Sequence, residues 1–565
     1  MELIKRTTLH YQAGNSDKVY EVDLCCVGEE RYLVNFRYGK RGGNLKEGTK
    51  TVEPVTLAKA EQTFTKLVNS KKVKGYQDVS QQQNPEEPTP LQKESREQII
   101  LTRLANRRED KWPLNRVIWR AGELKIKAAT PLLIPLLGTG EPLRDYSLVW
   151  SLGWCGDRYT IPVLQDLWQN ESQPEFIRRI AWEAAYKLGD EQSQGRMRQD
   201  KLQQLPTSLY QTASHGSATA FEEQLQEYLK FGDYKNFSVL DTIYQIDNEH
   251  VRPALLNILR TASLAPNYFR YIRHIFKMAE YRHDAEVFGS IARRLEKQKP
   301  MYYSNSWGVY HQNIGYLSKS RYTYNYQTRT REELEKSSFQ QEIERPDCRI
   351  AYSSSTRDYL RRRVWRTLRN FGKEGAREYV PLAAEVLLHY SDEDNQGLKK
   401  GSYYRWDSAN RTYVRSINNW DSFAGYLTFN HILYTNSPRY YLPNNCQAWR
   451  CRSDYKPGDS APEVREEAFP ELWEQEPEVL LQLLLQSSCT PVHNFAAKAL
   501  KDCRDFCQGL DTTTLITFLN KPYLATAQLG FELVRDRYNP EAPDLELVSA
   551  VVNCQSQAAR EQAYE

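Results

Sequence analysis

The sequence lacks the features that would place the chain in a membrane or in an oxidising compartment. Its 565 residues contain no apolar run of the roughly 18 residues that a membrane-spanning helix needs, and Met1 to Arg6 does not open a signal peptide. The 10 cysteines are scattered, with neither a Cys-x-x-Cys pair nor a dense framework. Cysteines of this kind are typical of reduced thiols in a cytosolic protein. We therefore expect a cytoplasmic protein without a disulfide scaffold and without a membrane partner.

Catalytic motifs are missing as well. The chain has no phosphate-binding loop of the Gly-x-x-x-x-Gly-Lys-Ser/Thr type and no Gly-x-Ser-x-Gly nucleophile turn. Cys446 and Cys451, with His431 upstream, are spaced more widely than zinc-binding cysteine pairs, and no fourth ligand is evident. We therefore expect no enzymatic activity, no cofactor and no bound metal.

The most informative feature that is present is the run of residues 37–43, which reads RYGKRGG. A tyrosine ring, cations and glycines between strand-like segments suit contact with a sugar-phosphate backbone. The plain alternative is a solvated hairpin turn, because glycine supplies the positive φ that such turns need. The candidate nucleic-acid-binding residues are Lys18, Arg37, Tyr38, Gly39, Lys40, Arg41 and Gly42.

The flanks of this run predict a small β-rich domain that ends in a helix. Residues 19–25 and 31–38 alternate apolar and polar side chains, as half-buried strands do. In residues 57–67, apolar side chains recur at helical spacing. Three blocks, SDKVY at residues 16–20, YGKRG at 38–42 and KKVKGY at 71–76, then give this segment its family resemblance. It resembles the WGR domain of eukaryotic poly(ADP-ribose) polymerases and of bacterial regulators of the molybdate metabolism type.

The resemblance extends from about Leu9 to Tyr76 and implies roles for individual residues. Tyr38 stands where the family has its tryptophan, and Lys40 stands where it has its arginine. In the polymerases this turn helps to hold a DNA end. The resemblance therefore implies that Tyr38 packs on a nucleotide and that Lys40 contacts the backbone.

Charge is concentrated in the same segment. Residues 1–76 contain 14 lysines and arginines against 9 aspartates and glutamates, whereas the whole chain has a formal net charge of +4. The positive excess therefore lies in the small N-terminal module. A local basic patch favours a polyanionic partner, although lysines also keep a small domain soluble.

Beyond the polar segment 77–94, which is typical of a flexible linker, the chain repeats itself. Trp119, Trp150 and Trp182 follow one another at 31 to 32 residues, each in a helix–turn–helix pattern. Prolines stand near the start of the second helices, where a missing N–H costs nothing. The units resemble HEAT-like repeats, and stacking of such units predicts an α-solenoid.

The same register returns near the C-terminus, where Pro491 and Pro522 are 31 residues apart. A further unit starts at Ala558 and stops within its first helix. Because solenoids need capping repeats, we expect the chain to be truncated there or completed by another chain.

Two aromatic-rich segments interrupt the repeats, at residues 301–356 and 401–460. Their tyrosines and arginines either fill irregular loops, contact a protein or stack on nucleic acid. Between them, residues 357–400 predict a helical pair, and its arginines 362, 366 and 369 share one face that we expect to be solvated.

The sequence thus predicts a multidomain protein with a small β-rich α+β domain followed by an all-α HEAT-like solenoid. The expected divisions are a WGR-like domain at 1–76, a linker at 77–94, helical repeats at 95–300, an insertion at 301–356, a helical pair at 357–400, an insertion at 401–460 and repeats at 461–565.

The function that this organisation favours is a non-catalytic adaptor. The WGR-like module binds nucleic acid, with DNA favoured over RNA, and the solenoid recruits a protein partner. One alternative is a purely protein-binding scaffold of a regulatory or stress-response complex. Another is a HEAT-like DNA base glycosylase, which would require an aromatic-lined cleft with an acidic residue.

Overall fold

The computed structural model divides the chain into two compact units, Met1–Leu136 and Leu137–Glu565. The structure describes residues 2–13, 16–28, 31–40, 45–51, 53–78, 91–107, 112–230, 234–311, 314–345, 347–407, 412–443, 448–452, 454–554, 557, 560 and 561. Each unit is described by itself.

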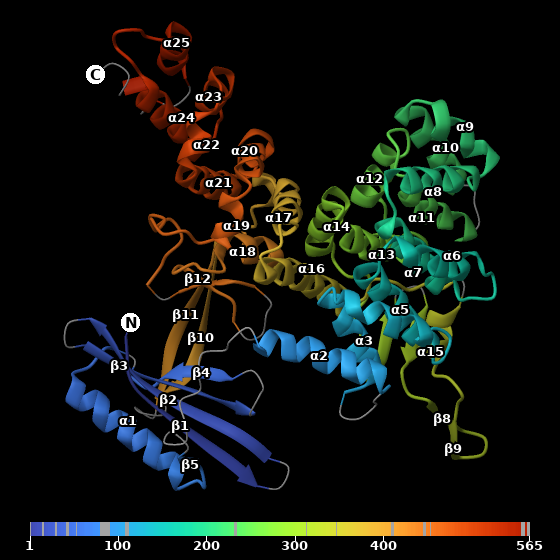
Figure 1. Ribbon diagram of the computed structural model, residues 1–565, viewed down its shortest axis with the longest axis horizontal. Helices are drawn as coiled ribbons and strands as arrows, with labels where there is room; N and C mark the ends of the chain where they lie inside the picture. Colours follow the sequence, from blue (N-terminus) through green and yellow to red (C-terminus); the bar gives the residue numbers. More distant parts are fainter. Residues whose placement is uncertain are drawn as a thin grey trace. The chain divides into compact units, whose positions relative to one another are not determined.

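The first unit begins with a five-stranded antiparallel sheet whose strand order is β4-β3-β2-β1-β5. Its strands are β1 (Glu2–Ala13), β2 (Ser16–Gly28), β3 (Arg31–Lys40), β4 (Lys46–Thr49) and β5 (Gln77–Asp78). The first four strands form a meander, and β5 returns after a helix to pair with β1 through Leu9 and His10. This helix, α1 (Leu57–Lys72), covers one face of the sheet (Figure 1).

A small core between α1 and the sheet explains why these residues fold in this way. The helix buries Ala60, Phe64 and Leu67, whose spacing of three to four residues places them on one side. They pack on alternate strand residues, including Val22 and Val34, which are both fully buried. The alternation and the helical period in the sequence predict both elements, and the structure confirms them.

The first unit also contains helices that follow the segment expected as a linker. They are α2 (Leu91–Ala105), α3 (Leu114–Glu123), η1 (Lys127–Ala129), α4 (Thr130–Leu133) and η2 (Ile134–Leu136). Residues 77 and 78 form β5 and residues 91–94 lie in α2, so both ends of the expected linker belong to regular structure. Its middle part lies outside the described residues.

The second unit is largely helical. Its first half contains α5 (Pro142–Cys155), η3 (Arg158–Thr160), α6 (Ile161–Gln169), α7 (Glu175–Leu188), α8 (Glu191–Gln203), α9 (Thr207–His215), α10 (Ala218–Lys230), η4 (Tyr234–Ser238), α11 (Val239–Ile246), α12 (Arg252–Thr261), α13 (Pro266–Arg282) and α14 (Ala285–Lys297). Its second half contains α15 (Ser338–Glu344), α16 (Ser354–Glu374), α17 (Tyr379–Leu388), η5 (Asp392–Asp394), α18 (Leu427–Tyr434), α19 (Pro470–Glu474), α20 (Pro477–Gln486), α21 (Thr490–Asp502), α22 (Arg504–Gln508), α23 (Thr512–Leu519), α24 (Leu524–Arg537) and α25 (Leu545–Asn553).

Short two-stranded ribbons lie between these helices, so the second unit is not all-α. They pair β6 (Gly308–His311) with β7 (Gly315–Ser318), β8 (Tyr322–Asn325) with β9 (Thr330–Glu333), β10 (Lys399–Asp407) with β11 (Thr412–Trp420), and β12 (Tyr440–Tyr441) with β13 (Arg450–Cys451). The ribbons fall within or at the edge of the two segments expected as insertions. Tyrosine- and threonine-rich sequence favours strands, and this local preference explains the departure from an all-α fold.

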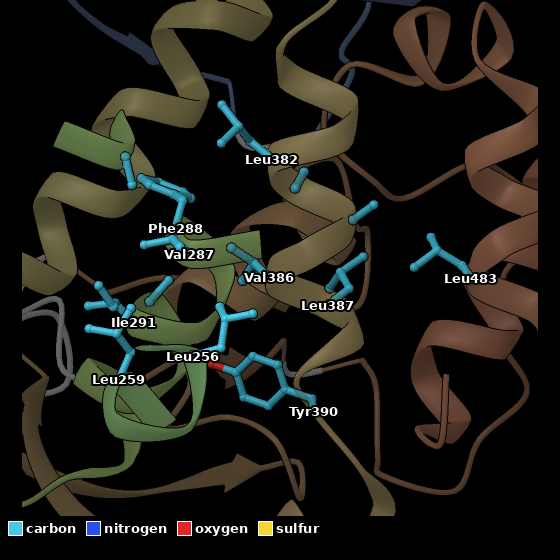
Figure 2. Close-up of a cluster of buried hydrophobic side chains, with 14 of the residues drawn as sticks. Leu256, Leu259, Val287, Phe288, Ile291, Leu382, Val386, Leu387, Tyr390 and Leu483 are labelled. Carbon is cyan, nitrogen blue, oxygen red and sulfur yellow. The ribbon is translucent and has the colours of Figure 1, made fainter. Parts of the chain in front are cut away.

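The centre of the second unit is the packing of α14 against α17. Figure 2 shows side chains of both helices meeting, among them Phe288 and Val386, with Leu256 of α12 beside them. Gly289 permits this approach, because a Cβ there would lie 2.6 Å from the backbone carbonyl carbon of Glu385. The two helices are therefore held by close-packed apolar surface, which tolerates little added volume.

A buried ion pair joins the second aromatic-rich segment to this core. Arg361 of α16 donates from Nε to Glu296 of α14 at 2.8 Å, and both side chains are almost fully buried. The same carboxylate accepts from the backbone N–H groups of Leu427 and Thr428 at the start of α18. Helix α18 also contributes Phe429 to the main core, so residues 401–460 are not a peripheral insertion throughout.

The helical pair expected at residues 357–400 is present as α16 and α17. Arg362, Arg366 and Arg369 are exposed, as expected, whereas Arg361 is buried and Arg363 pairs with Glu280 at 2.5 Å. The unit expected to start at Ala558 falls largely outside the described residues. Among the helices that the structure describes, none is long and apolar enough to span a bilayer.

Candidate nucleic-acid interface

Strand alternation places Tyr38 and Tyr20 side by side on the sheet face that α1 covers. The two residues are direct partners across β2 and β3. Their rings are stacked, with centroids 5.7 Å apart and an interplanar angle of 22°. Phe36 lies two residues before Tyr38, on the same face, and stacks on both rings. Three aromatic rings thus form a continuous platform at the end of the sheet.

Lysines lie over this platform. Lys71 continues the buried stripe of α1 by one turn beyond Leu67, and its Nζ is 4.1 Å from the centroid of the Tyr20 ring. Lys50, which follows β4, places its Nζ 5.9 Å from the centroid of Phe36. Ammonium groups over ring faces gain cation–π attraction and shield the rings from other contacts.

We call this surface the tyrosine–lysine face and define it by Tyr20, Phe36, Tyr38, Lys50, Lys71 and Lys74. Desolvation, followed by repulsion from Lys74 and Lys50, lowers the pKa of Lys71. Lys71 therefore carries its charge at some electrostatic cost in the absence of an anion. A polyanion at this face would relieve it.

The two tyrosines differ in exposure and therefore in what they can do. Tyr38 keeps 41 % of its surface exposed, whereas Tyr20 keeps 3 %. Burial, with smaller contributions from Tyr38 and Tyr76, raises the pKa of Tyr20 to about 12, so its phenol stays neutral and supports the platform from within. Tyr38 is thus the ring on which a base or sugar could pack.

Arg37 lies on the opposite face of the sheet from Tyr38. Its guanidinium pairs with Glu21 at 2.9 Å and lies 3.6 Å from Asp23, which Arg6 also binds at 2.6 Å. Because β3 continues to Lys40, neighbouring residues of the run point to alternate faces. The expected group is therefore divided, and Arg37 belongs to an ion-pair cluster rather than to the tyrosine–lysine face.

The remaining residues of the expected nucleic-acid site do not lie together in one described group. Lys18 is exposed, two residues before Tyr20 and so on its face, and it is the Cα partner of Lys40 across β2 and β3. Gly39 is the corresponding partner of Val19. The side chain of Lys40, and the whole of Arg41 and Gly42, lie outside the described residues.

Sequence reasoning missed the lysines that approach the rings. Lys71 and Lys74 belong to the closing KKVKGY block, and Lys50 lies where β4 ends. The available signal was the phase of Lys71, four residues after Leu67 on the apolar stripe of α1. No comparable pattern marks Lys50, whose position depends on the pairing of β3 with β4.

Comparison with known proteins identifies the first part of the chain. No curated protein and no solved structure is significantly similar to the chain. Residues 5–83 match the family model of the WGR domain. The five-stranded sheet with its covering helix is therefore a WGR domain, a domain associated with nucleic-acid binding, and it is followed by a long and mostly helical region.

Proposed function

We propose that this protein is a non-catalytic adaptor that binds DNA through the tyrosine–lysine face and docks a protein on its helical region. The observation that carries the proposal is the solvent-exposed ring of Tyr38, stacked on Tyr20 beneath the ammonium group of Lys71. A ring beside several cations offers stacking to a base and attraction to the phosphates on either side of it.

The proposed DNA affinity should depend strongly on the salt concentration. The described lysines of the first unit near the platform, Lys18, Lys50, Lys71 and Lys74, are mostly exposed, and Lys74 and Lys50 repel Lys71. Each cation that contacts a phosphate releases counterions, so log K falls by about 0.9 per contact for each unit of log salt. The affinity should therefore fall steeply between low and physiological salt.

The helical region supports the second half of the proposal. Successive helices pack in pairs, such as α6 with α7 and α23 with α24, and the tryptophan and proline spacing in the sequence is 31 to 32 residues. We propose that these pairs are HEAT-like repeats and that they form a scaffold for protein docking, as repeat proteins commonly do.

The test is DNA binding by the full-length chain. Fluorescence anisotropy with a short duplex, with and without a 5′ phosphate, is measured over a salt series for the wild type and for Tyr38→Ala combined with Lys71→Ala. We expect the double variant to lose at least ~10-fold in affinity, since one base–aromatic contact contributes about 1–3 kcal/mol. The slope against log salt should fall by about 0.9 for the lost lysine.

A matched control lies on the same helix. Lys59 is exposed on the outer side of α1, so Lys59→Ala removes the same charge without touching the rings. An RNA duplex of the same sequence distinguishes the two nucleic acids. Equal losses for the control and the double variant, or no binding of the wild type at low salt, would refute the proposed interface.

A purely protein-binding scaffold is the second candidate, and exposed aromatic residues favour it. Tyr310 and Tyr316 are cross-strand partners on β6 and β7, and both are exposed while their neighbours Val309 and Leu317 are buried. Exposed aromatic patches mark interaction surfaces. If the full-length protein binds neither DNA nor RNA at low salt, the result would favour a protein-binding scaffold.

A further inference from the structure

A cavity of about 270 Å³ lies within the second unit, between α5, α7, α11 and α13. Its lining combines aromatic, acidic and basic side chains, among them Tyr146, Phe176, Asp241, Tyr244, Arg273 and Lys277. A cavity of this size is near the lower end of small-ligand sites and admits one ligand of moderate size.

The acidic groups of the cavity already have cationic partners. Asp241 lies 3.1 Å from Arg179, and Glu183 is bound by Arg282 at 2.6 Å. The Glu183 carboxylate also accepts from Gln245. These pairs leave no carboxylate of the lining to neutralise the remaining cations.

Two cations of the lining, Arg273 and Lys277, have no carboxylate within ion-pair distance among the residues that the structure describes. They are four residues apart on α13 and therefore share one side of the helix. Arg273 is exposed and Lys277 is half-buried. Desolvation, with smaller contributions from Arg363 and Arg273, lowers the pKa of Lys277. An anion between them would restore the balance of charge.

A second, independent observation also indicates a ligand. Tyr244 is 1 % exposed, and its hydroxyl has no hydrogen-bond partner within the described part of the chain. A buried donor without an acceptor costs free energy, and such groups are rare in folded proteins. A ligand oxygen or nitrogen in the cavity could accept this hydrogen bond.

Another part of the lining is apolar and aromatic. The rings of Tyr146 on α5 and Phe176 on α7 lie 6.1 Å apart and are tilted by 46°. Beside them lie the aliphatic side chains of Ile180 and Met278. This wall suits a planar ring, and the polar pair of Asp241 with Gln245 can hydrogen-bond the edge of that ring.

We propose that this cavity binds one nucleotide, with its phosphate at Arg273 and Lys277 and its base against Tyr146 and Phe176. The site goes beyond the proposed function, because it lies in the other unit and uses none of the residues of the tyrosine–lysine face. The nucleotide is either free or the terminal residue of a single strand, since both present the same phosphate and base.

Calorimetric titration of the full-length chain tests the site with adenosine monophosphate, adenosine and inorganic phosphate. We expect adenosine monophosphate to bind with a dissociation constant below ~1 mM, and adenosine or phosphate alone to bind at least ~10-fold more weakly. Lys277→Ala and Phe176→Ala should each reduce the affinity by ~10-fold or more.

Lys235→Ala is the matched control, because Lys235 is an exposed lysine of η4 that does not line the cavity. A 5′-phosphorylated trinucleotide, titrated into the Tyr38→Ala, Lys71→Ala background, distinguishes a strand end from a free nucleotide. Binding of either ligand that is weakened by Lys277→Ala and not by Lys235→Ala supports the site. Equal effects of the two variants, or binding of the nucleotides no tighter than that of inorganic phosphate, would overturn it, provided that the melting temperatures of the variants are unchanged.

Discussion

The tyrosine–lysine face and the α13 cavity use the same residue types in opposite environments. On the sheet, the platform is open, Tyr38 is largely exposed and the lysines act from the surface. In the cavity, Tyr244 is buried and Lys277 is half-buried beside apolar side chains. An open surface attracts any polyanion and is screened by salt, whereas a concave site with partly buried groups also selects a ligand by shape.

This difference has a consequence for what each site could recognise. At the sheet, stacking and phosphate contacts are tolerant of sequence, because every nucleotide has a ring face and a charge. In the cavity, the unpartnered hydroxyl of the buried Tyr244 would penalise a ligand that lacks an acceptor. The first region therefore suits capture of nucleic acid, and the second suits recognition of one nucleotide.

The comparison assumes that each unit is stable without the other. Among the variants considered, Glu296→Ala is expected to lower the stability of the second unit most. The substitution leaves Arg361 buried without its carboxylate and removes the acceptor at the start of α18. Breaking one partner of a buried pair costs about 3–5 kcal/mol. Urea unfolding followed by tryptophan fluorescence reports mainly the second unit, since the first unit holds only Trp112 and Trp119 of the 12 tryptophans and its sheet holds none.

Two further variants complete this experiment. Glu296→Ala combined with Arg361→Met should regain part of the loss, because no unpaired charge then remains. Asp347→Ala breaks the exposed pair with Arg345 and should change stability by less than about 1 kcal/mol. DNA binding should survive Glu296→Ala, and its loss in step with the helical region would show that the two units do not fold separately.

Much of the first region could be predicted from the sequence, and little of the second. Alternation in residues 19–25 and 31–38 and the helical period of residues 57–67 predict β2, β3 and α1. The expected strand ends at Tyr38 and the expected turn covers residues 38–42, whereas the strand continues to Lys40. In a strand, adjacent residues cannot share a face, and Arg37 and Tyr38 are therefore separated.

The cavity could not be predicted because its residues come from four helices. Phe176, Tyr244 and Lys277 are far apart in the sequence, and none belongs to a short motif. Their meeting depends on helix crossing angles that side-chain patterns do not specify. Patterns of residue spacing identify helices, but a site lined by four helices depends on how those helices pack.

Lowering the pH should destabilise the helical region more than the sheet. The expected loss of stability lies between the effects of the other two predictions. Burial, with a smaller effect of Arg369, lowers the pKa of His431 to about 3, and burial lowers that of His389 to about 4. Unfolded histidines titrate near 6.5. Between pH 6.5 and about 4 the unfolded chain therefore binds protons that the folded chain does not, and stability falls as the pH decreases.

The expected loss is up to about 1 kcal/mol for each of these histidines when the pH is lowered from 7.0 to 5.5. The measurement is urea unfolding by tryptophan fluorescence at the two pH values. His431 stacks on Trp365 at 4.4 Å, so His431→Phe keeps an aromatic ring in that place while removing the titration. If His431→Phe loses as much stability between pH 7.0 and 5.5 as the wild type, His431 does not contribute to the acid sensitivity.

Tyr38→Trp is expected to have the smallest effect and examines the open face alone. Indole offers a larger stacking surface than phenol and a stronger cation–π partner, and the exposed side of residue 38 has room for it. We expect DNA affinity to rise by a few-fold, or less than about 1 kcal/mol, with the slope against log salt unchanged because no charge is added. Tyr159→Trp, at an exposed tyrosine of η3 in the helical unit, is the control and should leave DNA affinity as it is. A gain in the control equal to that in Tyr38→Trp would mean that added indole surface, and not the position over Tyr20, determines the affinity.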